Sequence, residues 1–209
     1  MEKKIIILCA RENAHFPVVL EILDHFYQYK TIGLYDDNSD LQGKSVLGVP
    51  VLGKIKNFPE NVPSGSIEFF IATGNNNFRS QCYNKIVDAG YRLVNVIHPS
   101  AVISKSAKIG TGVFVGANAT INNNSIIGNG VLINTGAIVE HDNVIEDFVN
   151  ISSNVSTAGR VKIRRNAFLG IGASIIPDIK IGENSIVGAG SVVIKNVERD
   201  VTVVGNPAK

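Results

Sequence analysis

Apolar residues follow two different patterns, one in the first 95 residues of the chain and another beyond them. In the first part, continuous apolar runs alternate with stretches in which apolar residues recur every three or four positions. Continuous runs are typical of strands buried on both faces, and the wider spacing is typical of amphipathic helices. We therefore expect a small open parallel sheet with flanking helices. Strands are predicted at 4–9, 31–35, 67–73 and 91–96, and helices at 16–26 and 76–89.

An open parallel sheet binds ligands beyond the carboxyl ends of its strands, so loops 9–15, 36–38 and 74–77 should surround one crevice. Asp36 and Asp37 follow the second strand, where acidic residues commonly bind ribose hydroxyls, although the pair would also suit a simple turn. His15 either contacts the substrate or caps the first helix. The first turn has no Gly-x-Gly-x-x-Gly motif, which argues against a dinucleotide cofactor.

From Ile97 onward, every sixth residue is apolar, with Thr157 as the exception. Glycine or a small polar residue often follows, which suits a tight corner of the backbone. This period predicts a solenoid in which each six-residue unit is a short strand plus a corner, and three units make one triangular coil. The interior positions are Ile97, Ile103, Ile109, Val115, Ile121, Ile127, Ile133, Val139, Ile145, Ile151, Thr157, Ile163, Leu169, Ile175, Ile181, Val187 and Val193.

The two patterns divide the chain into an α/β domain at 1–95, a β-helix at 96–195 and a C-terminal cap at 196–209. The 20 basic and 18 acidic residues give a net charge of +2, which predicts no affinity for nucleic acid. No 18 apolar residues run together, so no membrane insertion is expected. Two cysteines, Cys9 and Cys82, do not make a disulfide framework, and a cytoplasmic location is expected.

Several motifs together resemble those of bacterial amino-sugar N-acetyltransferases and sialic-acid O-acetyltransferases, and the resemblance covers nearly the whole chain. It implies a Rossmann-like N-terminal domain that holds a nucleotide sugar, followed by a left-handed parallel β-helix of the hexapeptide-repeat acyltransferase superfamily. It also implies a homotrimer with acetyl-CoA, and no metal, in the groove between neighbouring β-helices. The motifs are Asp36-Asp37, Ile71-Ala72-Thr73-Gly74-Asn75-Asn76, Ile97-His98-Pro99-Ser100-Ala101, Glu140-His141-Asp142, Phe168-Leu169-Gly170-Ile171-Gly172 and Val204-Gly205-Asn206-Pro207-Ala208.

The same resemblance assigns site residues. The family's general base matches His141, its acidic neighbour matches Asp142, and its oxyanion contact matches the backbone of Gly159. The family's glycine-rich first turn is replaced by Cys9 to His15, which keeps the histidine but has no glycine. Acetyl-CoA contacts match Asn150, Gly170, Ile171 and Ala189. The expected substrate contacts are Asn13, Ala14, His15, Asp36, Asp37, Gly74, Asn75 and Asn134.

His141 stands two residues after the interior Val139, just past a corner, so its side chain should project outward. Acyl transfer to an amine requires a base, and histidine titrates near neutral pH, which suits that role. A neighbouring carboxylate can fix the tautomer of the ring, and a backbone N–H can stabilise the oxyanion. The alternative is an exposed corner histidine without a role.

The predicted function is transfer of acetyl from acetyl-CoA to the amine of a nucleotide-linked amino-dideoxy sugar, for glycan biosynthesis. UDP is the first expectation for the nucleotide, followed by dTDP and GDP. O-acetylation of a sialic acid is the main alternative. A zinc hydratase would need three histidines, and the repeat has only His98 and His141. A non-catalytic β-helix binding protein would have no use for the N-terminal domain.

Overall fold

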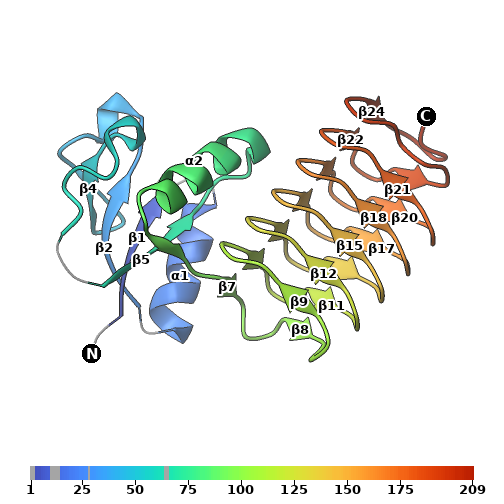
Figure 1. The fold of residues 1–209 in the computed structure, drawn as a ribbon, viewed down its shortest axis with the longest axis horizontal. Helices are drawn as coiled ribbons and strands as arrows, with labels where there is room; N and C mark the ends of the chain where they lie inside the picture. The colour runs from blue at the N-terminus through green and yellow to red at the C-terminus, as the bar shows by residue number, and fades with distance from the viewer. Residues whose placement is uncertain (1–2, 10–14, 28, 64–65) are drawn as a thin grey trace. The chain divides into compact units, whose positions relative to one another are not determined.

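The computed structural model describes residues 3–9, 15–27, 29–63 and 66–209, and it contains two compact units, Met1–Val96 and Ile97–Lys209. Figure 1 shows the helices and strands of each unit. The first unit holds a six-stranded sheet with the order β3-β4-β2-β1-β5-β6. Its strands are β1 (Lys3–Leu8), β2 (Tyr29–Tyr35), β3 (Ser45–Val46), β4 (Val49–Gly53), β5 (Ile67–Ile71) and β6 (Arg92–Leu93). Its helices are α1 (Phe16–Phe26) and α2 (Asn76–Asp88), with 3-10 turns η1 (Ser39–Leu41) and η2 (Ile55–Asn57).

Strand β1 is the centre of this sheet. Residues 5–8 are fully buried, as the continuous apolar run predicts, and β1 pairs in parallel with both β2 and β5. Leu8 lies opposite Tyr35 on one side and Ile71 on the other, so three strands end at the same edge. The expected parallel α/β sheet is confirmed, and the chain leaves β1, β2 and β5 at this one edge.

The hairpin of β3 and β4 was not expected from the sequence. Val46 pairs with Val49 in antiparallel fashion, and the connecting Leu47 and Gly48 both have positive φ. Strand β4 then pairs in parallel with β2 and extends the sheet. The hairpin is short and has a proline at position 50, so it contains no continuous apolar run that would predict a strand.

The second unit is a parallel β-helix whose strands form three sheets (Figure 1). Each strand is two residues long, and strands up to β23 pair at a spacing of 18 residues, as Ile121 does with Ile103 and Val139. The last strand, β24, pairs with β22 at a spacing of 16 residues, as Thr202 does with Ile186. The predicted coil of three hexads is therefore confirmed. The first sheet contains β7 (Val96–Ile97), β10 (Phe114–Val115), β13 (Leu132–Ile133), β16 (Asn150–Ile151), β19 (Phe168–Leu169), β22 (Ile186–Val187) and β24 (Thr202–Val203). The second contains β8 (Val102–Ile103), β11 (Thr120–Ile121), β14 (Ile138–Val139), β17 (Ser156–Thr157), β20 (Ser174–Ile175) and β23 (Val192–Val193). The third contains β9 (Lys108–Ile109), β12 (Ile126–Ile127), β15 (Val144–Ile145), β18 (Lys162–Ile163) and β21 (Lys180–Ile181).

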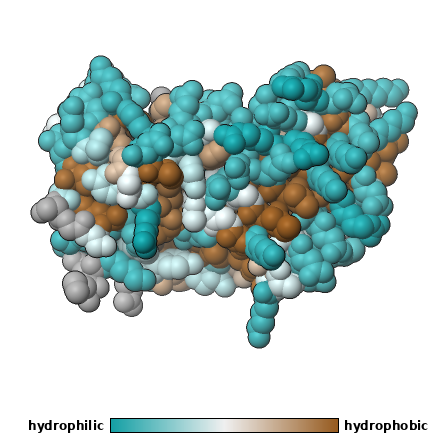
Figure 2. Space-filling model, viewed as in Figure 1, coloured by the Kyte–Doolittle hydropathy of each residue, from teal (hydrophilic) through white to brown (hydrophobic). Residues whose placement is uncertain are grey.

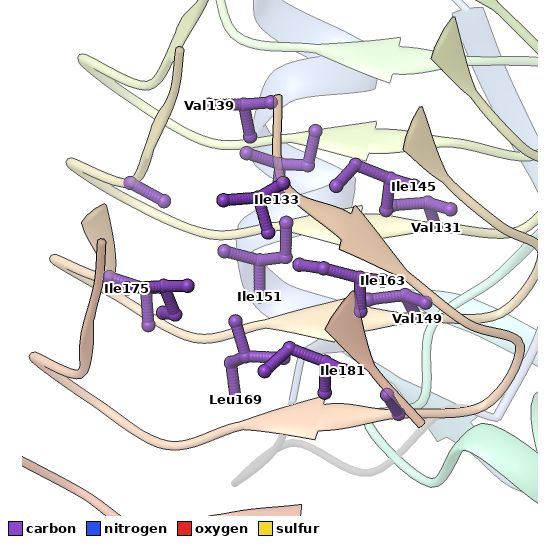
Figure 3. Close-up of a cluster of buried hydrophobic side chains, with 14 of the residues drawn as sticks. Val131, Ile133, Val139, Ile145, Val149, Ile151, Ile163, Leu169, Ile175 and Ile181 are labelled. Atoms are coloured by element: carbon purple, nitrogen blue, oxygen red, sulfur yellow. The ribbon is translucent and has the colours of Figure 1, made fainter. Parts of the chain in front are cut away.

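The hexad residues form the core of the β-helix. Figure 3 shows Ile133, Ile151 and Leu169 stacked in consecutive coils, and all three are fully buried. Thr157 is also buried, and its hydroxyl donates to the carbonyl of Ile138 at 3.3 Å, which satisfies the single polar member of the series. Beyond the last hexad, Val203 packs against this core from β24.

The corners of the coil place the candidate site. Between the second and third sheets, residues with positive φ recur every 18 positions, at Asn124, Asp142, Arg160 and Asp178. The N–H groups of Asp142, Arg160 and Asp178 each donate to a carbonyl one coil earlier. The N–H of Arg160, for example, donates to the carbonyl of His141 at 3.0 Å. This corner, called here the second corner, is therefore a regular column. The first corner joins the first and second sheets.

Neither helix within the described ranges is both long and apolar enough to span a bilayer.

Candidate active site

His141 and Asp142 lie together at the second corner, directly after β14. The Nδ1 atom of His141 is 2.7 Å from Oδ2 of Asp142, and the two side chains are 43% and 44% exposed. An ionised carboxylate can only accept a hydrogen bond, so Nδ1 carries the proton. The neutral ring then has its lone pair on Nε2, which is the arrangement that a general base requires.

Both carboxylate oxygens of Asp142 have partners. Oδ2 contacts His141, and Oδ1 accepts from Nδ2 of Asn124, one coil earlier, at 3.1 Å. The hydrogen bond from His141, followed by that from Asn124, holds the pKa of Asp142 below its ordinary value. Asp142 is therefore ionised at neutral pH. Asn124 was not expected from the sequence, although its position one 18-residue coil before Asp142 places it at the same corner.

Gly159 lies one coil after His141 and packs against the imidazole. A Cβ atom on Gly159 would lie 2.6 Å from Cε1 and 2.7 Å from Nε2 of His141, closer than atoms can approach. Only glycine therefore leaves room for the ring in this position. No hydrogen bond connects the Gly159 N–H to another described residue. This N–H is thus able to donate to a substrate oxygen.

The expected acetyl-CoA residues gather elsewhere, on the first sheet and the first corner. A Cβ atom on Gly170 would lie 2.6 Å from the backbone nitrogen of Ala189, which explains the glycine, and the neighbouring Ile171 is 62% exposed. Nδ2 of Asn134 donates to Oδ1 of Asn150 at 3.0 Å. Asn150 lies on β16 of the first sheet, and the other four residues lie at the first corner, which borders one edge of the second sheet. His141 lies at the opposite edge.

In the first unit, the ends of β1, β2 and β5 bring several expected substrate residues together. The Cys9 N–H donates to the Tyr35 carbonyl at 2.8 Å, and the Ala72 N–H donates to the Leu8 carbonyl at 2.9 Å. The loops that carry His15, Asp36, Asp37 and Gly74 therefore start side by side. Asn13 and Ala14 lie outside the described residues.

Three of the expected substrate residues also make structural hydrogen bonds. Asp36 is buried, and its Oδ1 accepts from the Asn38 N–H at 2.8 Å, which stabilises the turn after β2. Asn75 caps α2 by accepting from the Phe78 N–H at 2.9 Å. Asp37 is exposed, and its carboxylate accepts from the Lys56 N–H at 3.3 Å.

His15 precedes α1 and stays neutral at neutral pH. Its burial, followed by the charge of Arg79, lowers its pKa to about 4. Arg79 was not expected from the sequence. It is buried in α2 and donates to the carbonyl of Thr73 at 3.0 Å and to the side chain of Asn76 at 2.9 Å, so it fixes the loop after β5.

Among the described residues, no three His, Cys, Asp or Glu side chains lie close enough together to hold a metal ion.

Comparison with known proteins matches both parts of the chain to family models. The model of the PglD N-terminal domain matches residues 4–86, and the bacterial transferase hexapeptide model matches residues 160–195. The structure resembles PerB from Caulobacter crescentus, solved with CoA and GDP-perosamine, with 37% identity and a TM-score of 0.88 over 99% of this chain and 96% of that one. It also resembles the acetyltransferase domain of PglB from Neisseria gonorrhoeae, solved with acetyl coenzyme A, with 33% identity and a TM-score of 0.91 over 100% and 99%. WeeI from Acinetobacter baumannii is 28% identical, with a TM-score of 0.88 over 100% and 99%.

Proposed function

The chain belongs to the family of hexapeptide-repeat N-acetyltransferases with a PglD-type N-terminal domain, and we propose that it acetylates the amine of a nucleotide-linked amino-dideoxy sugar. Acetyl-CoA is the co-substrate. The observation that carries the proposal is the hydrogen-bonded pair of His141 and Asp142 packed on Gly159. This pair lies in a chain similar along its length to PerB, whose structure holds CoA and GDP-perosamine.

The three residues suit direct transfer. The nitrogen of the sugar amine attacks the thioester carbonyl, and Nε2 of His141 takes a proton from that amine. The Gly159 N–H donates to the oxygen that becomes negatively charged. When the C–S bond breaks, the thiolate of CoA leaves and is protonated, and the amide remains on the sugar. Asp142 orients the ring and stabilises its protonated form.

We further propose that the complete site needs two copies of the chain, as in a homotrimer. The candidate donor residues and His141 occupy opposite edges of the second sheet, so one edge of each copy would face the other edge of its neighbour. The outward residues of the strands support this. In the second sheet they are uncharged: Val102, Thr120, Ile138, Ser156, Ser174 and Val192.

The third sheet differs, since its outward residues include Lys108, Lys162 and Lys180. Charged residues are depleted from the centres of protein interfaces, so the lysine-bearing sheet suits solvent and the uncharged one suits a neighbouring copy. Figure 2 shows exposed apolar side chains among polar ones on the face of the coils that it displays. Ile138 and Val102 of the second sheet are 37% and 63% exposed in the single chain.

We also propose a cytoplasmic location, where thiols stay reduced. Cys9 and Cys82 are both free and buried.

Steady-state kinetics with purified protein and acetyl-CoA would test the proposed function. Amino sugars linked to UDP, GDP and dTDP should be compared with free sialic acid, because O-acetylation of a sialic acid is the alternative. We expect transfer to at least one nucleotide-linked amino sugar. His141→Ala should lower kcat by about 10²–10⁴-fold while acetyl-CoA binding persists. Turnover with sialic acid alone, or near-normal kcat of the variant, would contradict the proposal.

A further inference from the structure

An asparagine occupies a core position of the β-helix next to the candidate base. Between positions 101 and 191, the residue two places before each interior residue is alanine, valine, serine or isoleucine, except at Asn143. Its side chain is fully buried. It also lies two residues after His141, at the start of the next hexad. A buried amide at this point in an apolar core calls for a specific physical reason.

The amide of Asn143 connects two adjacent coils at the second corner. Its Nδ2 donates to the carbonyl of Glu140 and to that of Ala158 at 3.0 Å, with a longer contact of 3.4 Å to the carbonyl of His141. All three partners are acceptors, so the orientation of the amide is determined by its surroundings. The side chain thus binds the backbone that carries His141 and the backbone that leads into Gly159.

Ser125, one coil earlier, adds to the same arrangement. Its hydroxyl donates to the carbonyl of Glu140 at 2.8 Å and accepts from the Asn143 N–H at 3.3 Å. The Glu140 carbonyl therefore receives hydrogen bonds from two buried side chains. An apolar residue at position 143 would leave only the hydrogen bond from Ser125 to this carbonyl, immediately before His141.

Stability alone does not explain the asparagine. Its Oδ1 is buried and has no hydrogen-bond partner in the part of the chain that the structure describes, and such an acceptor is destabilising. One coil later, Val161 occupies the equivalent position and is fully buried. Valine at position 143 would therefore suit the core without leaving an unsatisfied acceptor.

We propose that Asn143 is a positioning residue for acetyl transfer. It fixes the backbone of Glu140 and His141 relative to that of Ala158 and Gly159, so that the imidazole and the Gly159 N–H keep a constant separation. The proposal rests on the proposed function of His141 and Gly159. Small displacements of reacting groups are enough to slow an enzyme strongly.

Asn143→Val and Asn143→Ala test this, because valine and alanine both occur at the equivalent position elsewhere in the repeat. We expect kcat to fall by about 10- to 100-fold, with the KM values of both substrates changed by less than about twofold. The melting temperature should be unchanged or higher. Asn143→Ser should recover part of the lost kcat, since serine can donate to the carbonyl three residues earlier.

Ser185→Ala is the matched control. Ser185 is fully buried at the same position of the repeat and donates to the carbonyl of Gly182, three residues earlier, at 2.7 Å. It lies away from the second corner, so its loss should leave kcat unchanged. A folded Asn143→Val or Asn143→Ala protein with the kcat of this control would overturn the proposal. Failure of both variants to fold would also overturn it, because Asn143 would then be a residue of the fold.

A second measurement separates this proposal from the proposed function. The chain has four histidines, so the ring signals of His141 can be assigned by NMR from their absence in His141→Ala. Asn143→Val should move these signals, and Ser185→Ala should not. Unmoved signals would refute the positioning role whether or not the protein transfers acetyl. Absence of transfer in the wild-type protein, with moved signals, would count against the proposed function alone.

Discussion

At the candidate base, the imidazole of His141 lies directly against the backbone of Gly159, where no Cβ atom fits. Gly159→Ala should push the ring away from its position and lower kcat by roughly 10-fold or more, because the base and the oxyanion donor separate. The KM for acetyl-CoA should change little, since the candidate donor contacts lie at the first corner. Steady-state kinetics, with thermal melting as the control for folding, would test this. An unaltered kcat would mean that the ring position is unimportant.

The lowered pKa of His15 predicts how acid affects the first unit. His15 has a pKa of about 4 in the folded protein, below the value of about 6.5 for an exposed histidine. Above about pH 6.5 His15 is neutral in both the folded and the unfolded protein, so its protonation does not lower the free energy of unfolding. As the pH falls from there towards 4, only the unfolded state binds the proton, so the free energy of unfolding should decrease by as much as about 3 kcal/mol.

Urea unfolding at several pH values would measure this effect. All five tyrosines lie in the first unit and the chain has no tryptophan, so tyrosine fluorescence reports on that unit alone. His15→Gln should flatten the decrease between about pH 6.5 and 4. A wild-type protein equally stable at both ends of this range would show that His15 accepts a proton without cost to the fold.

Among the elements, α2 depends on a cap that also belongs to the candidate substrate site. Asn75 accepts from the Phe78 N–H, and Asn75→Ala should lower the free energy of unfolding of the first unit by about 1 kcal/mol. Asn75→Asp retains the capping oxygen and should leave stability nearly unchanged. Tyrosine-detected urea unfolding would compare them. Equal stability of the two variants would indicate that the cap contributes nothing.

Long regular elements were predictable from the sequence, and short ones were not. The hexads specified the β-helix because one position in six must fill its interior, although the period does not determine the hand of the coil. The predicted strand at 91–96 is instead two short strands, β6 and β7. The chain leaves the six-stranded sheet of the first unit after Val94, whose N–H donates to the Phe69 carbonyl, and it joins the β-helix at Val96. Apolar character is similar on both sides of this transition, so the sequence pattern hides it.

The sequence predicts only those neighbours in the candidate site that follow from the 18-residue period of the coil. A coil of 18 residues places Gly159 beside His141 and Asn124 beside Asp142, so the repeat and the family motif together indicate this group. The contacts of Asn143 depend on how far an amide reaches across the core, which neither spacing nor composition determines. The hydrogen bonds of Arg79 similarly require coordinates.

On the scale of the whole molecule, the separation of the candidate donor residues from the base is the central physical fact. Within the coil that carries His141, residues 137–139 separate the first corner from the second, which is about 10 Å at 3.3 Å per residue, and the candidate donor residues lie in later coils. Acetyl transfer brings reacting atoms within about 3–3.5 Å of each other. In the proposed homotrimer, the first corner of one copy would meet the second corner of the next and bring the donor contacts to the base.

A charged residue on the outward face of the second sheet should therefore abolish both assembly and activity. Ser174 is exposed on β20, and Ser174→Lys places an ammonium group where an apolar neighbour is expected, at a desolvation cost that the single chain does not bear. Ile126→Lys is the control, because Ile126 is 46% exposed on the third sheet and pairs with Lys108. Light scattering should give three times 22.4 kDa, about 67 kDa, for the wild type and the control, and a smaller mass for Ser174→Lys. Full activity in a monomeric Ser174→Lys protein would show that one chain contains the whole site and would contradict the proposed two-copy site.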